Sequence, residues 1–264
     1  AMDPELFDAG GPGMVPDGWM DGAIVFVPDF SGAAAVFPTG DSGGKTGDVK
    51  PGPFVVAGPD ASAMEVLRAF AKLLGFRSEV CLSVLSADDS GFPLVDAYHR
   101  TVAGWTEVME VTGPAQHVLL LPAMTTGKVY RIGGEEEYFL VENRGAGEGY
   151  DLSLKNPGLA VYHIMESAPR SNLISSRGKW YSRVVNESPD SSYPVQTTGK
   201  CDPNTYLFRD GDELTPDYTN QNPPTDMHHP VNSNWHSGEP SDIAIMNVDT
   251  ISHYPIITAV FGRW

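Results

Sequence analysis

The amino-acid sequence predicts an α+β protein in which one buried helix in the N-terminal part precedes a β-rich C-terminal half, an antiparallel sheet or sandwich. Three observations support this fold class. The 264 residues include 28 glycines and 22 prolines, too many for a helix bundle. One segment combines the apolar spacing of a helix with a helix start signal. After residue 105, short apolar segments alternate with turn residues. We therefore expect two regions, residues 1–104 and 105–264.

The first predicted element is a strand at residues 23–27. Its sequence, AIVFV, is a continuous apolar run bounded by Gly22 and Pro28, which is typical of a buried strand. Residues 38–53 are dense in glycine, aspartate and proline, and they predict a long loop.

The helix is predicted over residues 63–75. Ser62 and Glu65 match the S-x-x-E capping box, in which two side chains satisfy backbone N–H groups at the helix start. The apolar residues that follow recur at helical spacing, and Gly75 provides a stop. Because apolar residues cover most of its surface, we expect this helix to be buried.

The remainder of the chain predicts a short amphipathic segment at 94–103 and then a series of strands. The strands are expected at residues 107–112, 118–121, 129–132, 138–142, 159–164, 182–185, 243–248 and 256–261. Residues 189–240 are polar and rich in proline and asparagine, so little regular structure is expected there.

The charge balance excludes several classes of partner. The chain has 17 Lys and Arg residues against 34 Asp and Glu residues, a formal net charge of −17. This charge would repel a phosphate backbone, so nucleic acid is not an expected partner. No uncharged apolar run approaches the roughly 20 residues that span a bilayer, so no membrane insertion is expected. We interpret the acidity as a solvated surface, with calcium binding as the lesser alternative.

Three short features concern covalent processing. Cys81 and Cys201 could form one disulfide across a long loop, or they could remain two free buried thiols. Asn186 begins an Asn-Glu-Ser triplet that matches the N-glycosylation pattern. The opening AMDPE is typical of a vector-derived scar, and a proteolytically processed N-terminus is the alternative.

Two groups of residues are candidate metal ligands. Acidic Asp-Gly turns offer oxygen ligands for calcium, although ordinary turns explain the same pattern; the aspartates are Asp17, Asp21, Asp210 and Asp212. A loose cluster in the Pro- and Asn-rich region could bind a metal, although exposed histidines are the simpler interpretation; its members are Asp226, His228, His229 and His236.

Three consecutive segments carry a family resemblance. They are EYFLVENR at 137–144, GYD at 149–151 and PGLAVYHI at 157–164. Together they resemble the stretch that follows the catalytic centre in immune inhibitor A-like secreted zinc metallopeptidases. Further landmarks occur along the chain in the same order as in that family, so that the resemblance covers roughly residues 17–262. They are DGWMDG at 17–22, LVDAY at 94–98 with Gly104-Trp105, RDGD at 209–212 and SNWHSG at 233–238.

The resemblance implies that residues 63–75 replace the zinc helix of the family. The motif H-E-x-x-H-x-x-G-x-x-D then falls on residues 64–74, so the three ligand positions hold Met64, Arg68 and Leu74. Only Glu65, at the general-base position, is retained. Catalytic zinc needs three protein ligands, and a charged arginine repels the metal. Arg68 could instead pair with the Glu65 carboxylate. A purely local role of Glu65 in the capping box is the alternative.

The resemblance therefore implies a truncated metallopeptidase-like half (1–104) and a catalytically inactive pseudoprotease. We expect it to be secreted or at the cell surface and retained for binding a protein or peptide partner or for extracellular self-assembly. No zinc and no cofactor is expected, with calcium left open. The alternative is an active zinc metalloendopeptidase whose ligands lie elsewhere, or on a missing N-terminal part. The histidines to test for that alternative are His163 and the pair His228 and His229.

Overall fold

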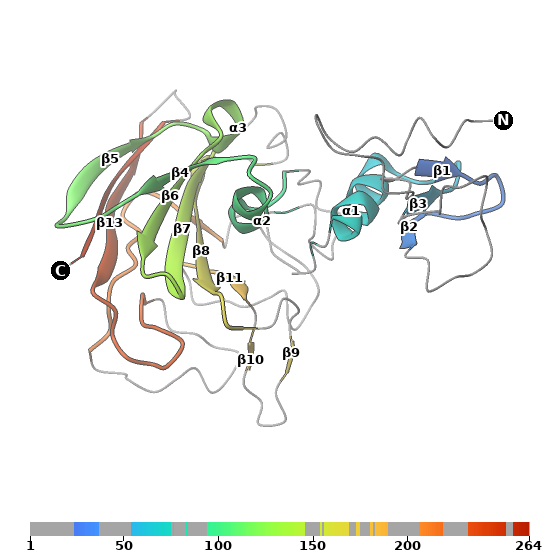
Figure 1. Ribbon diagram of the computed structural model, residues 1–264. Coiled ribbons are helices and arrows are strands. Elements are labelled where there is room, and N and C mark those ends of the chain that lie inside the picture. Colours follow the sequence, from blue (N-terminus) through green and yellow to red (C-terminus); the bar gives the residue numbers. More distant parts are fainter. Residues whose placement is uncertain are drawn as a thin grey trace, which may run out of the picture. The chain divides into compact units, whose positions relative to one another are not determined.

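The computed structural model describes two compact units, Ala1–Phe76 and Arg77–Trp264, whose elements are shown in Figure 1. The described residues are 24–36, 54–74, 76, 83, 94–145, 154, 156–168, 173–174, 180–181, 183–189, 206–218, 232–251 and 256–263.

The described residues of the first unit form a small sheet and one helix. Its strands run in the order β1 (Ile24–Phe26), β3 (Phe54–Ala57) and β2 (Ala33–Val36), with β1 parallel and β2 antiparallel to β3. Helix α1 (Ala63–Leu73) packs against β2 and β3. The capping box is confirmed, because the Ser62 side chain accepts a hydrogen bond from the Glu65 backbone N–H.

The expected burial of this first unit is wrong. Helix α1 buries only Ala69 and Ala71, while three of its apolar side chains are more than two-fifths exposed; they are Leu67 (42%), Phe70 (44%) and Leu74 (43%). The reason is that the sheet strands cover one face of the helix. Strand β1 is also exposed, because helix α1 packs mainly on β2 and β3, and β1 lies at the sheet edge opposite β2. A continuous apolar run therefore does not by itself indicate burial.

The second unit is built around a six-stranded sheet. Its order is β11-β8-β7-β6-β4, with β12 also paired to β8. Every pair is antiparallel except β4 with β6. The strands are β4 (Glu107–Glu110), β6 (Lys128–Gly133), β7 (Glu137–Arg144), β8 (Gly158–Met165), β11 (Val184–Asn186) and β12 (Leu207–Phe208).

Three further groups of elements complete this unit. An antiparallel sheet has the order β13 (Ile243–Thr250), β14 (Ile257–Arg263) and β5 (Gln116–Leu120). Strands β9 (Leu173–Ile174) and β10 (Trp180–Tyr181) form a separate pair. Helices α2 (Ala97–Val102) and α3 (Ala123–Thr126) are short.

Strand β7 is buried on both faces, and this defines two cores. Side chains alternate along a strand, so Phe139 and Val141 face a core that they share with Ile245 and Phe261 of the smaller sheet. Leu140 faces the other way, into a core shared with Tyr98 of α2. The two sheets thus form a sandwich, and α2 covers the outer face of the larger sheet.

The β-rich C-terminal half is confirmed. Each strand predicted after residue 105 has a counterpart in the structure, with ends displaced by a few residues. The sequence did not predict β2, β3, β9, β10, β12 or α3, which are all four residues or shorter. Within the described part of the chain, no helix is long and apolar enough to cross a membrane.

Candidate metal centre

Helix α1 carries no histidine or cysteine, and its one acidic side chain, Glu65, is engaged locally. The Glu65 carboxylate accepts hydrogen bonds from the Ser62 backbone N–H at 2.7 Å and from the Ser62 hydroxyl at 2.9 Å. These two bonds hold the pKa of Glu65 below its usual value, and the nearby charge of Arg68 lowers it further. The carboxylate is therefore used locally as a helix cap. Neither Met64 nor Leu74 offers a ligand atom that suits zinc.

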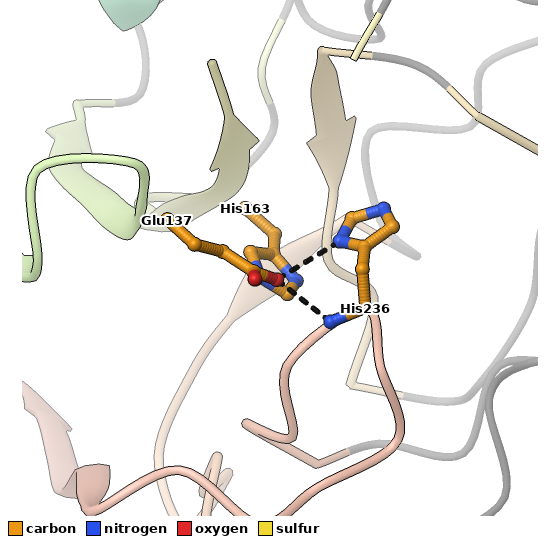
Figure 2. Close-up of side chains that lie close together, drawn as sticks. All are labelled: Glu137, His163 and His236. Carbon is orange, nitrogen blue, oxygen red and sulfur yellow. Dashed lines mark hydrogen bonds and ion pairs between the residues drawn. The ribbon is translucent and has the colours of Figure 1, made fainter. Parts of the chain in front are cut away.

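A different set of side chains converges in the second unit. Glu137, His163 and His236 place their ligand atoms within 4.8 Å of one another, the one such group of three among the residues that the structure describes. The Glu137 carboxylate Oε1 lies 2.9 Å from His163 Nε2 and 3.2 Å from His236 Nδ1. In Figure 2 the Glu137 carboxylate lies against the His163 ring, and the ring nitrogen and the backbone nitrogen of His236 both point to it.

Strand pairing brings Glu137 and His163 together. Glu137 begins β7, and His163 lies in β8 opposite Phe139, so Glu137 is its diagonal neighbour. Both side chains are on the sheet face that carries Phe139, because residues two apart in a strand share a face. The His163 ring stacks on Phe139, with 4.3 Å between ring centroids. The position of His163 is therefore set by the register of two central strands.

A turn before β13 supplies His236. The Trp235 N–H donates to the Glu239 carbonyl and the Gly238 N–H donates back to the Trp235 carbonyl, which closes the turn. The His236 backbone N–H donates to Glu137 Oε1 at 2.7 Å. This turn is therefore fastened to the start of β7 by main chain as well as by side chain.

A second carboxylate faces the other nitrogen of His163. Glu187, directly after β11, places Oε1 3.4 Å from His163 Nδ1, and both side chains are almost fully buried. Burial by itself would lower the pKa of His163, but the contacts with Glu137 and Glu187 outweigh it and raise the pKa. Burial would raise the pKa of Glu137, yet the two histidines hold it well below its usual range.

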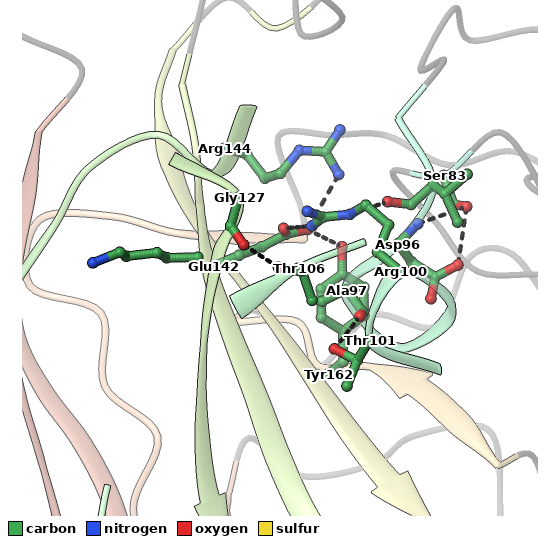
Figure 3. Close-up of polar contacts among 12 residues, drawn as sticks. Ser83, Asp96, Ala97, Arg100, Thr101, Thr106, Gly127, Glu142, Arg144 and Tyr162 are labelled. Carbon is green, nitrogen blue, oxygen red and sulfur yellow. Dashed lines mark hydrogen bonds and ion pairs between the residues drawn. The ribbon is translucent and has the colours of Figure 1, made fainter. Parts of the chain in front are cut away.

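A separate polar network lies on the opposite face of β7 (Figure 3). Arg100 of α2 bonds the buried Glu142, which also accepts from the Tyr162 hydroxyl at 3.0 Å and lies 3.6 Å from Arg144. These residues join α2 to β7 and β8. Because its charges are enclosed and mutually paired, we interpret this network as structural.

The same helix begins with a buried cap. Asp96 accepts from the His99 backbone N–H at 3.0 Å and contacts His99 Nδ1 at 2.8 Å. Burial would raise the pKa of Asp96, but His99 and Ser83 outweigh it, so the pKa lies below its usual value.

Two of the four calcium candidates, Asp210 and Asp212, lie in the described part of the chain. Asp210 Oδ1 accepts both the Thr250 N–H and the Thr250 hydroxyl at 2.6 Å, and Asp212 accepts the Arg209 N–H at 2.7 Å. The pair forms an ordinary hydrogen-bonded Asp-Gly turn. The other two calcium candidates, Asp17 and Asp21, lie outside the described residues. The same holds for the disulfide candidates Cys81 and Cys201 and for the metal candidates Asp226, His228 and His229.

The structure argues against glycosylation at Asn186. This residue lies inside β11, paired with Tyr162 of β8, and is only 6% exposed. A glycan is bulky and needs a surface position. The triplet is therefore interpreted as a chance match.

The sequence identified two members of the centre without combining them. His163 was one of the histidines to test, and His236 belonged to the loose cluster with His228 and His229. Glu137 lies in the EYFLVENR segment and carries no local signal of a metal ligand. The missing signal was long-range, since 26 residues separate Glu137 from His163 and 99 separate it from His236. A histidine inside the apolar run of β8 was the best local indication.

Comparison with protein-family models, with curated proteins and with solved structures finds no match for this chain.

Proposed function

We propose that the chain is a catalytically inactive domain of the immune inhibitor A type, secreted and retained for binding a protein or peptide. One observation carries this proposal. Glu65, the one acidic residue where the zinc motif of the family would lie, acts as a helix cap. The ligand positions of that motif hold Met64, Arg68 and Leu74. The order of sequence landmarks on both sides of the helix supports the resemblance.

The chemistry of the first unit supports inactivity. Its 76 residues contain no histidine, so the helix has no imidazole ligand of its own. Without a bound zinc, nothing lowers the pKa of a water molecule to about 7, and a glutamate has no activated nucleophile to deprotonate. Peptide hydrolysis at α1 would therefore lack both the metal and the activated water.

The first unit also offers a surface suited to peptide binding. Strand β1 pairs only with β3 among the described strands, and its apolar side chains are exposed, with Phe26 at 71%. An extended peptide could add to this edge through main-chain hydrogen bonds, while the exposed side chains contact alternate residues of the peptide.

Peptidase assays test the proposal directly. The purified full chain, supplied with Zn(II), is incubated with casein and with a peptide library, and we expect no cleavage. The Glu65→Gln variant is the matched control, since it removes the one retained catalytic position. Chelator-sensitive cleavage that Glu65→Gln abolishes would contradict the proposal.

A second candidate is an active zinc metalloendopeptidase with its ligands outside α1. The observation that favours it is the convergence of two histidines and one carboxylate at Glu137, His163 and His236. Two imidazoles and a carboxylate are a known ligand set of catalytic zinc. Cleavage that survives Glu65→Gln but is lost in His236→Ala would support this candidate over the first.

A further inference from the structure

We propose that Glu137, His163 and His236 form a binding site for one divalent transition-metal ion of the zinc class, and that the ion fastens three segments of the second unit. This inference goes beyond the proposed function and holds whether or not the chain binds peptides.

The geometry is close to that of a zinc site. Ligand atoms around a tetrahedral zinc lie about 3.3 Å apart when each is about 2.0 Å from the metal. The Glu137 oxygen lies 2.9 Å and 3.2 Å from the two imidazole nitrogens, so only small displacements would admit an ion. One ligand atom from each of the three residues lies within 4.8 Å of the other two.

The buried surroundings of His163 are an independent observation. Metal-bound histidines commonly direct their second ring nitrogen to a carboxylate, which fixes the tautomer and the ring orientation. Glu187 faces His163 Nδ1 at 3.4 Å, and Phe139 stacks on the ring. Nε2 is thereby held toward Glu137 and His236. A buried histidine that has a buried glutamate behind it and directs Nε2 to the other two candidate ligands is typical of a preorganised metal ligand.

The donor set selects the class of metal. Imidazole nitrogens suit Zn²⁺, Cu²⁺, Ni²⁺ and Fe²⁺, whereas Ca²⁺ and Mg²⁺ prefer oxygen ligands alone. Two of the three ligand atoms here are nitrogens. The side chain of Glu137 is 23% exposed, against 9% for His236 and 1% for His163, so the carboxylate is the side from which an ion could enter.

The surroundings favour a structural ion over a hydrolytic one. A hydrolytic site needs a general base beside the metal-bound water. Glu187 contacts Nδ1 of His163, on the side of the ring away from the ligand atom Nε2, so its carboxylate does not stand beside the position of a metal-bound water. The ion would instead join the start of β7, the middle of β8 and the turn before β13.

Titration of Zn(II) into the chelator-treated full chain tests the site. We expect one ion per chain, and a melting temperature that rises by about 5–10 °C when free Zn(II) is about 100 times Kd. His236→Ala should weaken binding by more than about 100-fold, because a ligand is lost rather than an outer partner. Glu187→Gln should retain the stoichiometry and weaken binding by about 10–100-fold.

Two control variants test whether loss of Zn(II) binding is specific to the proposed ligands. His117→Ala removes an exposed histidine of β5 in the same unit and should bind Zn(II) like the wild type. The double variant His228→Ala/His229→Ala should also bind normally. Circular dichroism of each metal-free variant establishes that it is folded, and Co(II) absorption reports imidazole coordination in the wild type.

The proposal is overturned by any of three outcomes. The wild-type chain binds no Zn(II), in which case the cluster is only a hydrogen-bonded structural group. His236→Ala, folded, binds as tightly as the wild type. Alternatively, the double variant loses the ion while His236→Ala keeps it, which assigns the metal to residues 228 and 229. None of these readouts depends on peptidase activity, so the proposed function is tested separately.

Discussion

Helix α1 and the Glu137 centre place similar chemical groups in opposite environments. At α1, Glu65 finds its partners three residues away, on a helix that keeps several apolar side chains exposed. At the centre, Glu137 finds its partners 26 and 99 residues away, one in the almost fully buried strand β8 and one in the turn before β13. Both carboxyl groups have a lowered pKa, the first from local hydrogen bonds and the second from distant histidines.

This difference shows why the motif on α1 indicates less about a possible metal site than the Glu137 centre does. A local cap stabilises a helix wherever the helix lies, and it leaves no group for further chemistry. A partly buried cluster assembled from distant residues forms only when the whole unit folds, so its ligand atoms are already oriented. Disturbing each kind of contact should therefore give effects of different size.

The largest effect is expected in the buried network on the other face of β7. Glu142→Ala removes the carboxylate that Arg100 and Arg144 share, and breaking a buried charge pair costs about 3–5 kcal/mol. Urea unfolding of the second unit measures the loss. Glu110→Ala is the matched control, since its ion pair with Arg131 is half-exposed and is worth about 0–1 kcal/mol. Equal losses in the two variants would show that burial does not govern these contacts.

An intermediate effect is expected at Asp96, and it depends on pH. Because the folded-state pKa is lowered, the charged carboxylate stabilises the fold above the unfolded pKa of about 3.9, and this stability is lost as the pH falls through the folded pKa. Each unit of separation between the two pKa values contributes about 1.4 kcal/mol. Asp96→Asn keeps a side chain that caps helices well but removes the titrating charge.

Urea unfolding of the wild type and of Asp96→Asn between pH 7 and pH 3 measures this contribution. We expect the free energy of unfolding to fall more steeply with acid in the wild type than in the variant. Parallel curves would mean that Asp96 does not carry the dependence, because all other carboxylates are common to both proteins.

The smallest effect is expected at the helix cap of the first unit. Ser62→Ala removes the hydroxyl that accepts the Glu65 N–H and should destabilise α1 by about 1 kcal/mol. Ser62→Asp, which keeps a capping oxygen, is the control and should retain most of the stability. Amide exchange along α1 reports the change. A loss that extends to β7 and β8 would show that the cap is not a local device.

Many helices and strands of the fold can be predicted from the sequence, because the patterns that indicate them involve neighbouring residues. The capping box at Ser62 and Glu65 and the apolar runs of β7, β8, β13 and β14 each depend on neighbouring residues. The burial of an element could not be predicted from local sequence in the same way. The apolar run at 23–27 predicted a buried strand, yet β1 lies at a sheet edge, because the choice between edge and centre depends on which strand pairs with it.

The sequence by itself determined the β-rich second half, the capped helix, the strongly acidic charge and the absence of histidine from the first 76 residues. Tertiary structure alone decided that Glu137, His163 and His236 meet while Asp210 and Asp212 close a turn. The physical reason is that helix caps and strand periodicity depend on residues that are only a few positions apart in the sequence. A three-ligand centre instead depends on strand register and on where a distant turn is fastened.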